Sequence, residues 1–583
     1  MIDKTKSAKV LTLYLFIVFI FIVYLSVMLF TVLKPRKLPI TYSQSTSKAQ
    51  RGSIISADGF HLATTKKLYK AVVNATSIDP QKKELFVELF SIYSGIDSKE
   101  IHQKLKGAKG STVLSYDISQ IQAQYLKQLA YELRRHKVFM EVLNPRTGFK
   151  IVHGLDIKES GESRIYPYGD LLTPVIGYPR KIDDGSYTKV RGVKGLEKRF
   201  EVELQSQQDA FSRGKRDVNG YKILNKNSLT KPKINGLDIQ LTIPIAFQIK
   251  IEKMLDEMKK EIRAKEIMIA IMDSKTGDVL SLASSNRFLP KNIKKSDYPS
   301  LNVGVTEYSF EPGSVIKVIT FALLLDKGLI NPYELVNAHG GRYRIGKTLI
   351  TDEHKFDWLS AENVIVHSSN IGIAQLANKL TGIEFNMGLK DFGFSKKSTP
   401  DLIYEKVGKV PASKRLENEI YKSRCSYGYG MRANLMQLMR AYSVFSNNGR
   451  MITPRLVSNF IDEHKREIPL ENKEQVQVIK SSTASRMRKI LIKTVNKGTG
   501  LKAKTKGLTV GGKTGTAHIV EKKRYVKKYN TTFVGFVDDE NKSYTIGVVV
   551  IKPKKSQFAA QTAVPVFKKA VDLLVEDGYL DIY

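Results

Sequence analysis

A chain of 583 residues is too long for a single hydrophobic core, so we expect two or more domains. Its 94 Lys and Arg residues outnumber 57 Asp and Glu residues, which gives a net charge of +37, but these basic residues are spread through every segment. With no dense basic tail and no interleaved aromatic platform, the charge does not indicate a nucleic-acid-binding protein. The single cysteine, Cys425, excludes an internal disulfide framework, and the nine histidines show no Cys–His spacing of the zinc-site type.

An apolar run without charged residues covers residues 10–33. About 20 such residues span a bilayer as a helix, so the sequence predicts a transmembrane segment. The run is longer than the apolar core of a cleaved signal peptide and ends without a small-x-small site, which favours an uncleaved anchor. We expect residues 1–9 to be a cytoplasmic tail and the rest to be exported, because long domains translocate largely regardless of flanking charge.

Residues 38–235 are predicted to form a mixed but β-rich domain. Residues 51–55, followed by Asp58-Gly59, predict a short strand and a tight turn. Residues 85–133 carry helical patterns, with apolar residues recurring near every 3.6 positions. Residues 206–235 are polar and lack apolar periodicity, which fits either a β-hairpin or a linker before a new domain.

Residues 236–583 are predicted to form a second domain, of the α+β class. Strand patterns lie near both of its ends and helical patterns fill the middle, which indicates one antiparallel sheet with helices on both faces. The expected elements include hairpins over 267–283 and 531–551 and helices over 244–262 and 559–576.

The first chemical pattern is Ser314-x-x-Lys317. Pro312 and Gly313 break the chain before it, and residues 315–325 predict a helix that is apolar nearly all round and therefore buried. Residues at i and i+3 share a helical face, so the amine lies within reach of the hydroxyl. A serine nucleophile needs an adjacent base, and a buried lysine can lose its proton near neutral pH. Alone, the pattern also fits a plain helix N-cap with a chance lysine.

Two further patterns follow in order. Ser368-Ser369-Asn370 precedes a helical stretch, and alone this pattern fits a helix cap. In the functional interpretation, Ser368 relays a proton and Asn370 hydrogen-bonds a substrate amide. Residues 508–519 predict a strand that contains Lys513-Thr514-Gly515-Thr516, with small residues where a ligand backbone approaches. Taken alone, the Lys-Thr-Gly pattern also fits an ordinary strand without a role in a site. The three patterns together, in this order, favour a serine acyl-transferase site.

Three other residues invite a chemical role. Cys425 has no histidine at catalytic spacing, so we expect a buried structural thiol. His367 adjoins Ser368, but no partnering Asp is evident, and we assign it no catalytic role. Trp358 is expected in the core.

The trio Ser-x-x-Lys, Ser-x-Asn and Lys-Thr-Gly resembles the active-site motifs of penicillin-binding proteins and serine β-lactamases. The resemblance covers nearly the whole chain. The anchor, together with Arg51-Gly52, Tyr166-Pro167 and Gly192-x-x-Gly195-Leu196-Glu197, looks like the non-catalytic pedestal of the class B proteins. Residues 311–314, 426–430 and 512–517 look most like the septal, or cell-division, branch. Val315-Ile316 and Tyr429 depart from the commoner residues at their positions without removing a reacting group.

The resemblance implies a pedestal (dimerisation-type) domain, then a serine β-lactamase/transpeptidase-like domain that crosslinks peptidoglycan stem peptides as a D,D-transpeptidase. It implies catalytic roles for Ser314, Lys317, Ser368, Asn370 and Lys513, and substrate-binding or oxyanion-binding roles for Thr514, Gly515 and Thr516. No metal or organic cofactor is implied.

The implied partners are peptidoglycan stem peptides on the lipid-linked precursor and the nascent glycan, β-lactams as inhibitors, a membrane glycan polymerase and divisome proteins, but no nucleic acid. The implied location is the bacterial inner (cytoplasmic) membrane, with one span and the catalytic domain in the periplasm or on the outer face. Three alternatives stay open: an elongation-type transpeptidase, a non-catalytic β-lactam-binding sensor or scaffold, and a β-lactamase.

Overall fold

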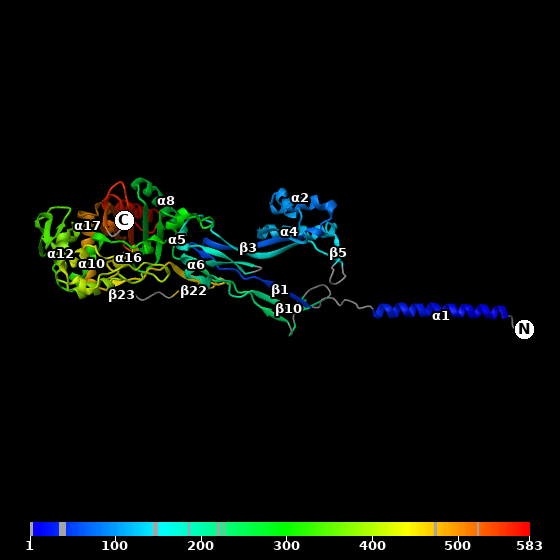
Figure 1. The fold of residues 1–583 in the computed structure, drawn as a ribbon. Helices are drawn as coiled ribbons and strands as arrows, with labels where there is room; N and C mark the ends of the chain where they lie inside the picture. Colours follow the sequence, from blue (N-terminus) through cyan, green and yellow to red (C-terminus); the bar gives the residue numbers. More distant parts are fainter. Residues whose placement is uncertain are drawn as a thin grey trace. The chain divides into compact units, whose positions relative to one another are not determined.

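The structure, a computed structural model, describes residues 4–33, 42–143, 150–184, 187–217, 222–223, 225–226, 228–470, 475–521 and 524–582. The chain divides into two compact units. The first unit lies within Met1–Ala49 and Gln208–Ile234, and the second unit lies within Gln50–Gln207 and Asn235–Tyr583. Figure 1 shows the elements of both units, which are described in turn.

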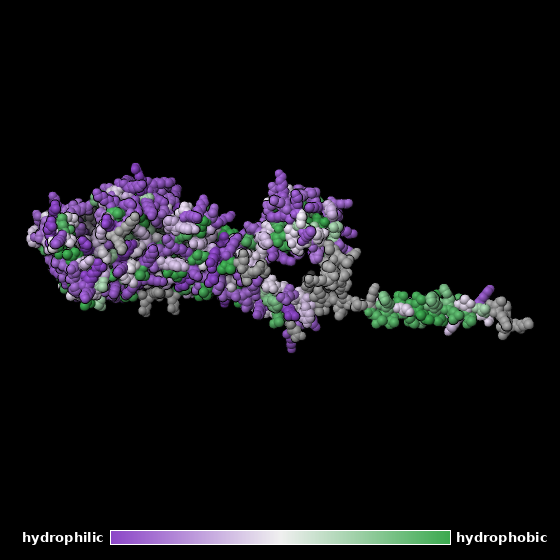
Figure 2. All heavy atoms as spheres, viewed as in Figure 1, coloured by the Kyte–Doolittle hydropathy of each residue, from purple (hydrophilic) through white to green (hydrophobic). Residues whose placement is uncertain are grey.

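Helix α1 (Lys4–Leu33) opens the first unit. Its surface is hydrophobic over most of its length (Figure 2). Residues 6–33 are long and apolar enough to cross a bilayer, by length and composition, although a signal sequence would meet the same criterion. The structure therefore confirms an apolar helix where the sequence predicts a transmembrane segment.

A small antiparallel sheet completes the first unit. It consists of β1 (Tyr42–Ser47), β10 (Ala210–Arg216), β11 (Lys222–Ile223) and β12 (Leu229–Lys231). Strand β10 pairs with each of the other three strands. Of the two sequence predictions for residues 206–235, the β-hairpin is therefore the one that the structure shows.

A nine-stranded mixed sheet organises the N-terminal part of the second unit, in the order β22-β21-β13-β2-β3-β7-β9-β8 with β4 paired to β3. Its strands are β2 (Ile54–Ile55), β3 (His61–Asn74), β4 (Ser111–Ile118), β7 (Leu155–Ile165), β8 (Pro179–Asp184), β9 (Tyr187–Gly192), β13 (Asp238–Leu241), β21 (Val457–Ile461) and β22 (Glu467–Pro469). Helices α2 (Lys83–Ser94), α3 (Ser98–Leu105) and α4 (Gln120–Arg135) pack beside β3 and β4 around Phe86, Phe90 and Leu126. The prediction that residues 85–133 are helical is thus wrong at β4.

Arg51, Gly52 and Glu197, three of the pedestal residues singled out in the sequence, meet Arg164 in one buried ion network. Arg51 Nη2 lies 2.8 Å from Glu197 Oε2, and Arg164 Nε lies 2.6 Å from Glu197 Oε1. Burial, the largest effect, raises the pKa of Glu197, but Arg164 and Arg51 outweigh it and hold that pKa below its usual value. Arg164 Nη1 also donates to the Gly52 carbonyl at 2.6 Å. The network therefore ties the chain beside β2 to β7 and to helix α6 (Gly195–Arg199).

The C-terminal part of the second unit is built on a five-stranded antiparallel sheet in the order β15-β14-β26-β25-β24. The strands are β14 (Glu266–Asp273), β15 (Val279–Ser284), β24 (Thr509–Glu521), β25 (Arg524–Asp538) and β26 (Ser543–Ile551). Side chains alternate along β14, so Ile267 and Ile269 join one core while Met268 and Ala270 join another.

Helices cover both faces of this sheet. Helices α8 (Ile245–Ile262) and α18 (Ala563–Glu576) bury one face, and α10 (Ile316–Asp326) and α16 (Leu435–Ser443) bury the other. The predicted α+β architecture is confirmed. Strand β24, which carries the Lys-Thr-Gly pattern, forms an edge of the sheet.

The remaining strands and helices are β5 (Glu141–Leu143), β6 (Lys150–Val152), α5 (Thr173–Ile176), α7 (Glu201–Leu204), α9 (Gly304–Glu307), β16 (Leu335–Asn337), β17 (Arg342–Ile345), β18 (Thr348–Thr351), β19 (Trp358–Ser360), α11 (Ala361–Val366), α12 (Asn370–Ala377), α13 (Gly382–Asp391), α14 (Ser413–Leu416), α15 (Glu419–Ser426), β20 (Arg450–Met451), β23 (Val476–Gln477) and α17 (Ser481–Lys497).

Candidate active site

Ser314 lies in a short 3₁₀ turn, Gly313–Val315, that runs directly into α10 at Ile316. The sequence predicts the serine at the start of the helix itself, and the structure inserts this tighter turn first. A 3₁₀ turn is a common way to begin a helix, and it stacks residues i and i+3 on one side. Lys317 is fully buried at the start of α10, whose side chains are apolar and buried on nearly every side, as predicted.

Close backbone packing fixes the position of the turn. Gly313 adopts φ +63°, and its N–H donates to the Gly428 carbonyl at 3.3 Å. A Cβ atom on Gly428 would lie 2.1 Å from the Gly313 oxygen, and one on Gly515 would lie 2.9 Å from the Pro312 oxygen. Glycine is required because no side chain fits between these backbones. The turn that carries Ser314 is therefore held between the loop after α15 and strand β24.

Lys317 and Ser368 are hydrogen-bonded to each other. Lys317 Nζ donates to Ser368 Oγ at 3.1 Å and to the Ser368 carbonyl at 2.5 Å. Ser368 adopts φ +60°, a left-handed conformation, and so offers both oxygens to the amine. Burial lowers the pKa of Lys317 to about 7, against the opposing negative charges of Asp352 and Glu353. Among the described residues, the Ser314 hydroxyl makes no hydrogen bond, so it is free to react.

Asp352 orients the Ser368-Ser369-Asn370 segment, and the sequence gives no motif for it. Its Oδ1 accepts the N–H of Asn370 at 2.6 Å, and its Oδ2 accepts the Ser369 hydroxyl. Ser369 is the N-cap of α12, since its Oγ accepts the Gly372 N–H at 2.8 Å. The helix-cap interpretation therefore applies to Ser369, while Ser368 and Asn370 on either side of it line a cavity.

Lys513 lies fully buried on β24. Its Nζ donates to the Thr514 carbonyl at 3.2 Å and to Thr514 Oγ1 at 3.3 Å. Thr514 Oγ1 donates to Thr499 Oγ1 at 2.8 Å, and Thr499 is a second residue that the sequence pattern does not reveal. Burial, followed by the positive charge of Lys317, lowers the pKa of Lys513 well below its usual value. An anionic group bound here would restore the charged form of Lys513.

One cavity of about 530 Å³ connects these elements. It is lined by Ser314, Glu353, His354, Ser368, Asn370, Gly498, Thr499, Leu501, Lys502, Thr514, Thr516, Phe558, Ala559, Ala560 and Gln561. Ser314, Ser368, Asn370, Thr514 and Thr516 thus share one cavity, while Lys317 and Lys513 are buried beside it and Gly515 faces the nucleophile turn. A nucleophile, an amine with a near-neutral pKa, a hydroxyl that is hydrogen-bonded to that amine and donors for an anion are the parts of an acyl-transfer site.

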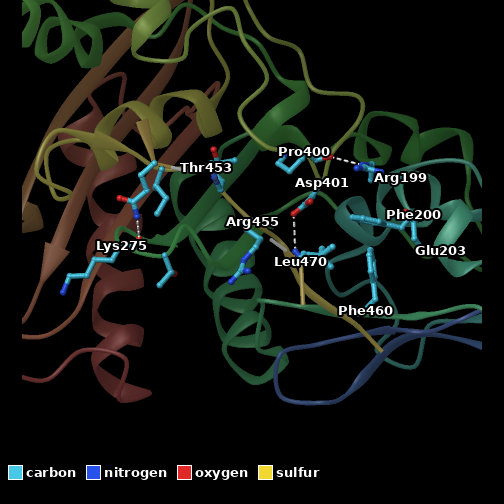
Figure 3. Close-up of a pocket in the computed structure, with 15 residues that line it drawn as sticks. Arg199, Phe200, Glu203, Lys275, Pro400, Asp401, Thr453, Arg455, Phe460 and Leu470 are labelled. Carbon is cyan, nitrogen blue, oxygen red and sulfur yellow. Dashed lines mark hydrogen bonds between the residues drawn. The ribbon is translucent and has the colours of Figure 1, made fainter. Parts of the chain in front are cut away.

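A second cavity, of about 420 Å³, lies away from these residues (Figure 3). Phe200, Phe460 and Leu470 line it, Arg199 Nε donates to the Pro400 carbonyl at 2.9 Å, and Asp401 Oδ2 accepts the Leu456 N–H at 2.7 Å. The side chains of Arg199, Asp401 and Arg455 are occupied in holding the chain, and none of the three motifs contributes to this cavity. We therefore place the candidate active site in the cavity beside Ser314.

The three other residues singled out in the sequence have different outcomes. Cys425 is fully buried, as expected, and burial raises the pKa of its thiol to about 12. The ring of His367 packs on Phe356 with a centroid distance of 4.9 Å. Trp358 is 59% exposed, so the prediction of a core position is wrong. It lies on the two-stranded ribbon of β16 and β19. Val336 and Leu359 of this ribbon point into the core, whereas Trp358 points to solvent.

Comparison with known families matches nearly all of the chain beyond the first helix. The model described as penicillin-binding protein dimerisation domain matches residues 46–241, and the model described as penicillin-binding protein transpeptidase domain matches residues 267–572. These are the pedestal and the catalytic domain that the sequence resemblance implies.

Individual relatives agree with this assignment. Stage V sporulation protein D of Bacillus subtilis is 28% identical over 436 residues, which are 72% of this chain and 65% of that protein. Peptidoglycan D,D-transpeptidase FtsI of Buchnera aphidicola is 27% identical over 547 residues, 91% of this chain and 88% of that protein. The solved structure of penicillin binding protein 3 from Mycobacterium tuberculosis, complexed with ampicillin, has the same fold, with a TM-score of 0.66 at 20% identity over 92% of this chain and 97% of that chain. The chain belongs to the class B penicillin-binding proteins, the peptidoglycan D,D-transpeptidases that carry a dimerisation domain ahead of a serine transpeptidase domain.

Proposed function

We propose that this chain is a membrane-anchored enzyme that crosslinks peptidoglycan stem peptides through an acyl-enzyme on Ser314. The observation that carries the proposal is the convergence of the Ser314 turn, the hydrogen-bonded Lys317–Ser368 pair and strand β24 at one cavity. The near-neutral pKa of Lys317 supports its role as base.

Acylation begins when Ser314 Oγ attacks the carbonyl carbon of the penultimate D-Ala. The hydroxyl proton passes to the neutral amine of Lys317, and the carbonyl oxygen becomes an oxyanion. We assign the binding of that oxyanion to the backbone N–H groups of Ser314 and Thr516, and the close approach of the nucleophile turn to Thr516 supports this assignment. Each donor of this kind contributes about 3 kcal/mol to transition-state stabilisation.

The terminal D-Ala then leaves as its C–N bond breaks. Its amine takes a proton from the Ser368 hydroxyl, which Lys317 reprotonates across their 3.1 Å hydrogen bond. Lys513 assists this transfer from β24, and with Thr514 and Thr516 it binds the carboxylate of the substrate. The amine of a second stem peptide attacks the ester, the same groups carry its proton back to Ser314 Oγ, and the crosslink is formed.

Covalent labelling tests the nucleophile. We expect a fluorescent penicillin to label the wild-type chain and the Ser296→Ala variant, whose substitution lies on an exposed segment, but not Ser314→Ala. Labelling of Ser314→Ala would refute the assignment. Purified chain supplied with glycan strands should also produce crosslinked peptide dimers; labelling without dimers would instead support the sensor or scaffold, and rapid loss of the label would support a β-lactamase.

A role in septal wall synthesis is the finer proposal. It is supported by the resemblance of residues 311–314, 426–430 and 512–517 to the septal branch and by the similarity to FtsI. The same branch suggests a glycan polymerase and divisome proteins as partners, with α1 as a single-pass anchor in the cytoplasmic membrane and the catalytic part outside. Depletion of the chain in its native cell should give filaments; rounded cells would favour the elongation-type alternative.

Susceptibility to β-lactams follows from the same chemistry. The related structure from Mycobacterium tuberculosis is a complex with ampicillin, and the cavity of this chain is lined by the Ser314 hydroxyl. We propose that β-lactams acylate Ser314. We propose residues 38–235 as the pedestal domain and residues 236–583 as the transpeptidase domain.

A further inference from the structure

The small sheet of the first unit has one face with an unusual composition. In antiparallel pairs, residues directly opposite each other point to the same side of the sheet. Tyr42 lies opposite Lys215, Phe211 opposite Lys231, Arg213 opposite Leu229, and Lys215 opposite Ile223. These residues form what we call the basic-aromatic face: Tyr42, Phe211, Arg213, Lys215, Ile223, Leu229 and Lys231.

Side-chain contacts and exposure support this assignment. The guanidinium of Arg213 lies over the ring of Tyr42, 5.9 Å from its centroid, so the two side chains are on the same side. Tyr42 is 47% exposed, Ile223 45% and Leu229 59%, and the three cations of the face are exposed as well. The opposite side carries small residues such as Ser43, Ser45 and Gly214. Large apolar side chains are thus concentrated on one open face, together with Arg213, Lys215 and Lys231, while the register places Arg216 and Lys222 on the other side.

The charge of this face has one sign. Its strand residues include Arg213, Lys215 and Lys231 and no carboxylate. The whole segment 208–234 has the same bias in composition. Its only acidic residues are Asp209 and Asp217, and they are outnumbered by seven basic residues: Arg213, Lys215, Arg216, Lys222, Lys226, Lys231 and Lys233. Exposed tyrosine and aliphatic side chains flanked by Lys and Arg, without acids, are typical of surfaces that enter the headgroup region of an anionic bilayer.

The covalent structure keeps this sheet near the membrane. Helix α1 ends at Leu33 and β1 begins at Tyr42, so eight residues separate them. Because an extended chain spans at most about 3.6 Å per residue, the start of β1 lies within about 30 Å of the end of α1. The intervening sequence contains Lys34, Arg36 and Lys37. The sheet must therefore lie near the side of the bilayer on which α1 ends, whichever direction the chain crosses the bilayer.

We propose that the basic-aromatic face binds the anionic lipid headgroups of that leaflet. Arg213, Lys215 and Lys231 pair with lipid phosphates, while Tyr42, Ile223 and Leu229 enter the boundary between headgroups and acyl chains. The inference rests on the proposed anchoring of α1 in a bilayer and is independent of the transpeptidase chemistry.

The test uses the full-length chain in lipid nanodiscs, with co-elution confirming that α1 is inserted. Hydrogen–deuterium exchange of the β10 and β12 amides is compared in discs of phosphatidylcholine alone and discs with half phosphatidylglycerol. Each cation near an anionic surface changes the docked-to-undocked ratio about fivefold, so three change it about a hundredfold. We expect slower exchange in the anionic discs only, and a loss of that protection at 0.5 M salt, where the screening length is about 4 Å.

Charge variants make the test specific. Arg213→Gln with Lys215→Gln and Lys231→Gln should abolish the protection while leaving exchange in neutral discs unchanged, which shows that the sheet still folds. The matched control replaces three exposed lysines of the second unit, Lys260, Lys489 and Lys554, by Gln and should keep the protection. Equal exchange in both kinds of disc, protection that survives in the triple variant, or protection that requires another membrane protein would each overturn the proposal. Failure to co-elute with the discs would instead refute the anchor.

Discussion

At the scale of single residues, the charge state of Lys317 controls what the candidate site can do. Its amine is fully buried and bonded to Ser368, and burial brings its pKa to about 7. An amine can accept the Ser314 proton only when it is neutral. Lys317 is therefore the group whose titration we expect to see in the kinetics.

The pH dependence of acylation follows from this pKa. Below pH 7, Lys317 is protonated and cannot act as base, so the second-order rate of penicillin acylation should fall about tenfold per pH unit; above pH 7 it should level off. Stopped-flow labelling between pH 5.5 and 9 measures this profile. A rate that is flat across that range would exclude Lys317 as the base.

Glu353 offers a finer test of the same electrostatics. Its carboxylate lines the cavity and raises the pKa of Lys317, whereas burial lowers it. Glu353→Gln should therefore move the midpoint of the acylation profile to lower pH, most clearly at low salt because Glu353 is exposed. Lys355→Gln, an exposed change two residues away, serves as control, and a midpoint that moved upward in Glu353→Gln would contradict the assignment.

The residues that we propose as catalytic could be singled out from the sequence because each belongs to a short pattern with its own chemistry. Ser314 and Lys317 are three positions apart, and that spacing survives the change from helix to 3₁₀ turn. Asp352 and Thr499 were not predictable, because each reaches its motif from a different part of the chain. Asp352 follows β18 and Thr499 follows α17. They can be recognised as site residues only in the folded chain, where they contact Ser369 and Thr514.

At the scale of elements, the nucleophile turn depends on backbone contacts that tolerate no side chain. Gly428→Ala would place a Cβ atom 2.1 Å from the Gly313 oxygen, so the turn would have to move. A displacement of about 1 Å costs roughly a hundredfold in rate, and we expect at least that loss in penicillin acylation.

Gly430→Ala is the matched control. Gly430 also has positive φ, +77°, but its Cβ would meet nothing within 4 Å. It should lose about 1–2 kcal/mol of stability from backbone strain, visible as a lower melting temperature, and keep its acylation rate. Equal rates in the two variants would show that the Gly313–Gly428 contact does not position Ser314.

The long, strongly patterned elements were predictable, and the short ones that depend on distant partners were not. Short apolar runs bounded by turn residues identify β14, β26 and the second half of β25, and apolar periodicity identifies α8 and α18. Strand β4 has the mixed sequence Ser-Thr-Val-Leu-Ser-Tyr-Asp-Ile, and pairing with β3 stabilises it. Such tertiary pairing overrides local preference. Gly107 and Gly110, which precede β4, are the local signal that could have separated it from the helix before it.

At the scale of the whole molecule, the buried Arg51–Glu197–Arg164 network is a stability determinant far from the chemistry. Glu197→Gln leaves the buried guanidinium of Arg164 without its carboxylate partner and leaves Arg51 paired with Glu201 only, which should cost about 3–5 kcal/mol. Glu132→Gln, which removes a surface ion pair with Arg135, should cost under about 1 kcal/mol. Thermal unfolding of the detergent-solubilised chain ranks the two variants, and equal melting temperatures would contradict the assignment.

The pH dependence of that stability has a definite sign. The pKa of Glu197 is lower in the folded chain than in the unfolded chain, so its contribution is present above the usual glutamate value of 4.5 and is lost as pH falls below it. The melting temperatures of wild type and Glu197→Gln should therefore converge as pH falls below 4.5. A difference that stayed constant down to pH 3 would exclude Glu197 as its source.

The two predicted domains share structure within the second unit. Strand β13 pairs in parallel with β2, placing Ile239 opposite Ile54. The Leu172 N–H donates to Glu252 Oε1 at 3.0 Å, and Arg287 Nε lies 3.3 Å from Asp170 Oδ2. The domain boundary at residues 235 and 236 stays a prediction, since pairing between residues so distant in sequence leaves no compositional trace.

Cys425 has a practical consequence for the study of the whole molecule. Its thiol is fully buried, and with a pKa of about 12 it carries almost no thiolate at neutral pH. A cysteine introduced at an exposed position would then react with maleimide reagents far faster than Cys425. Spectroscopic labels can therefore be attached beside the Ser314 cavity or on β12 in an otherwise unaltered chain, with each label reporting a single site.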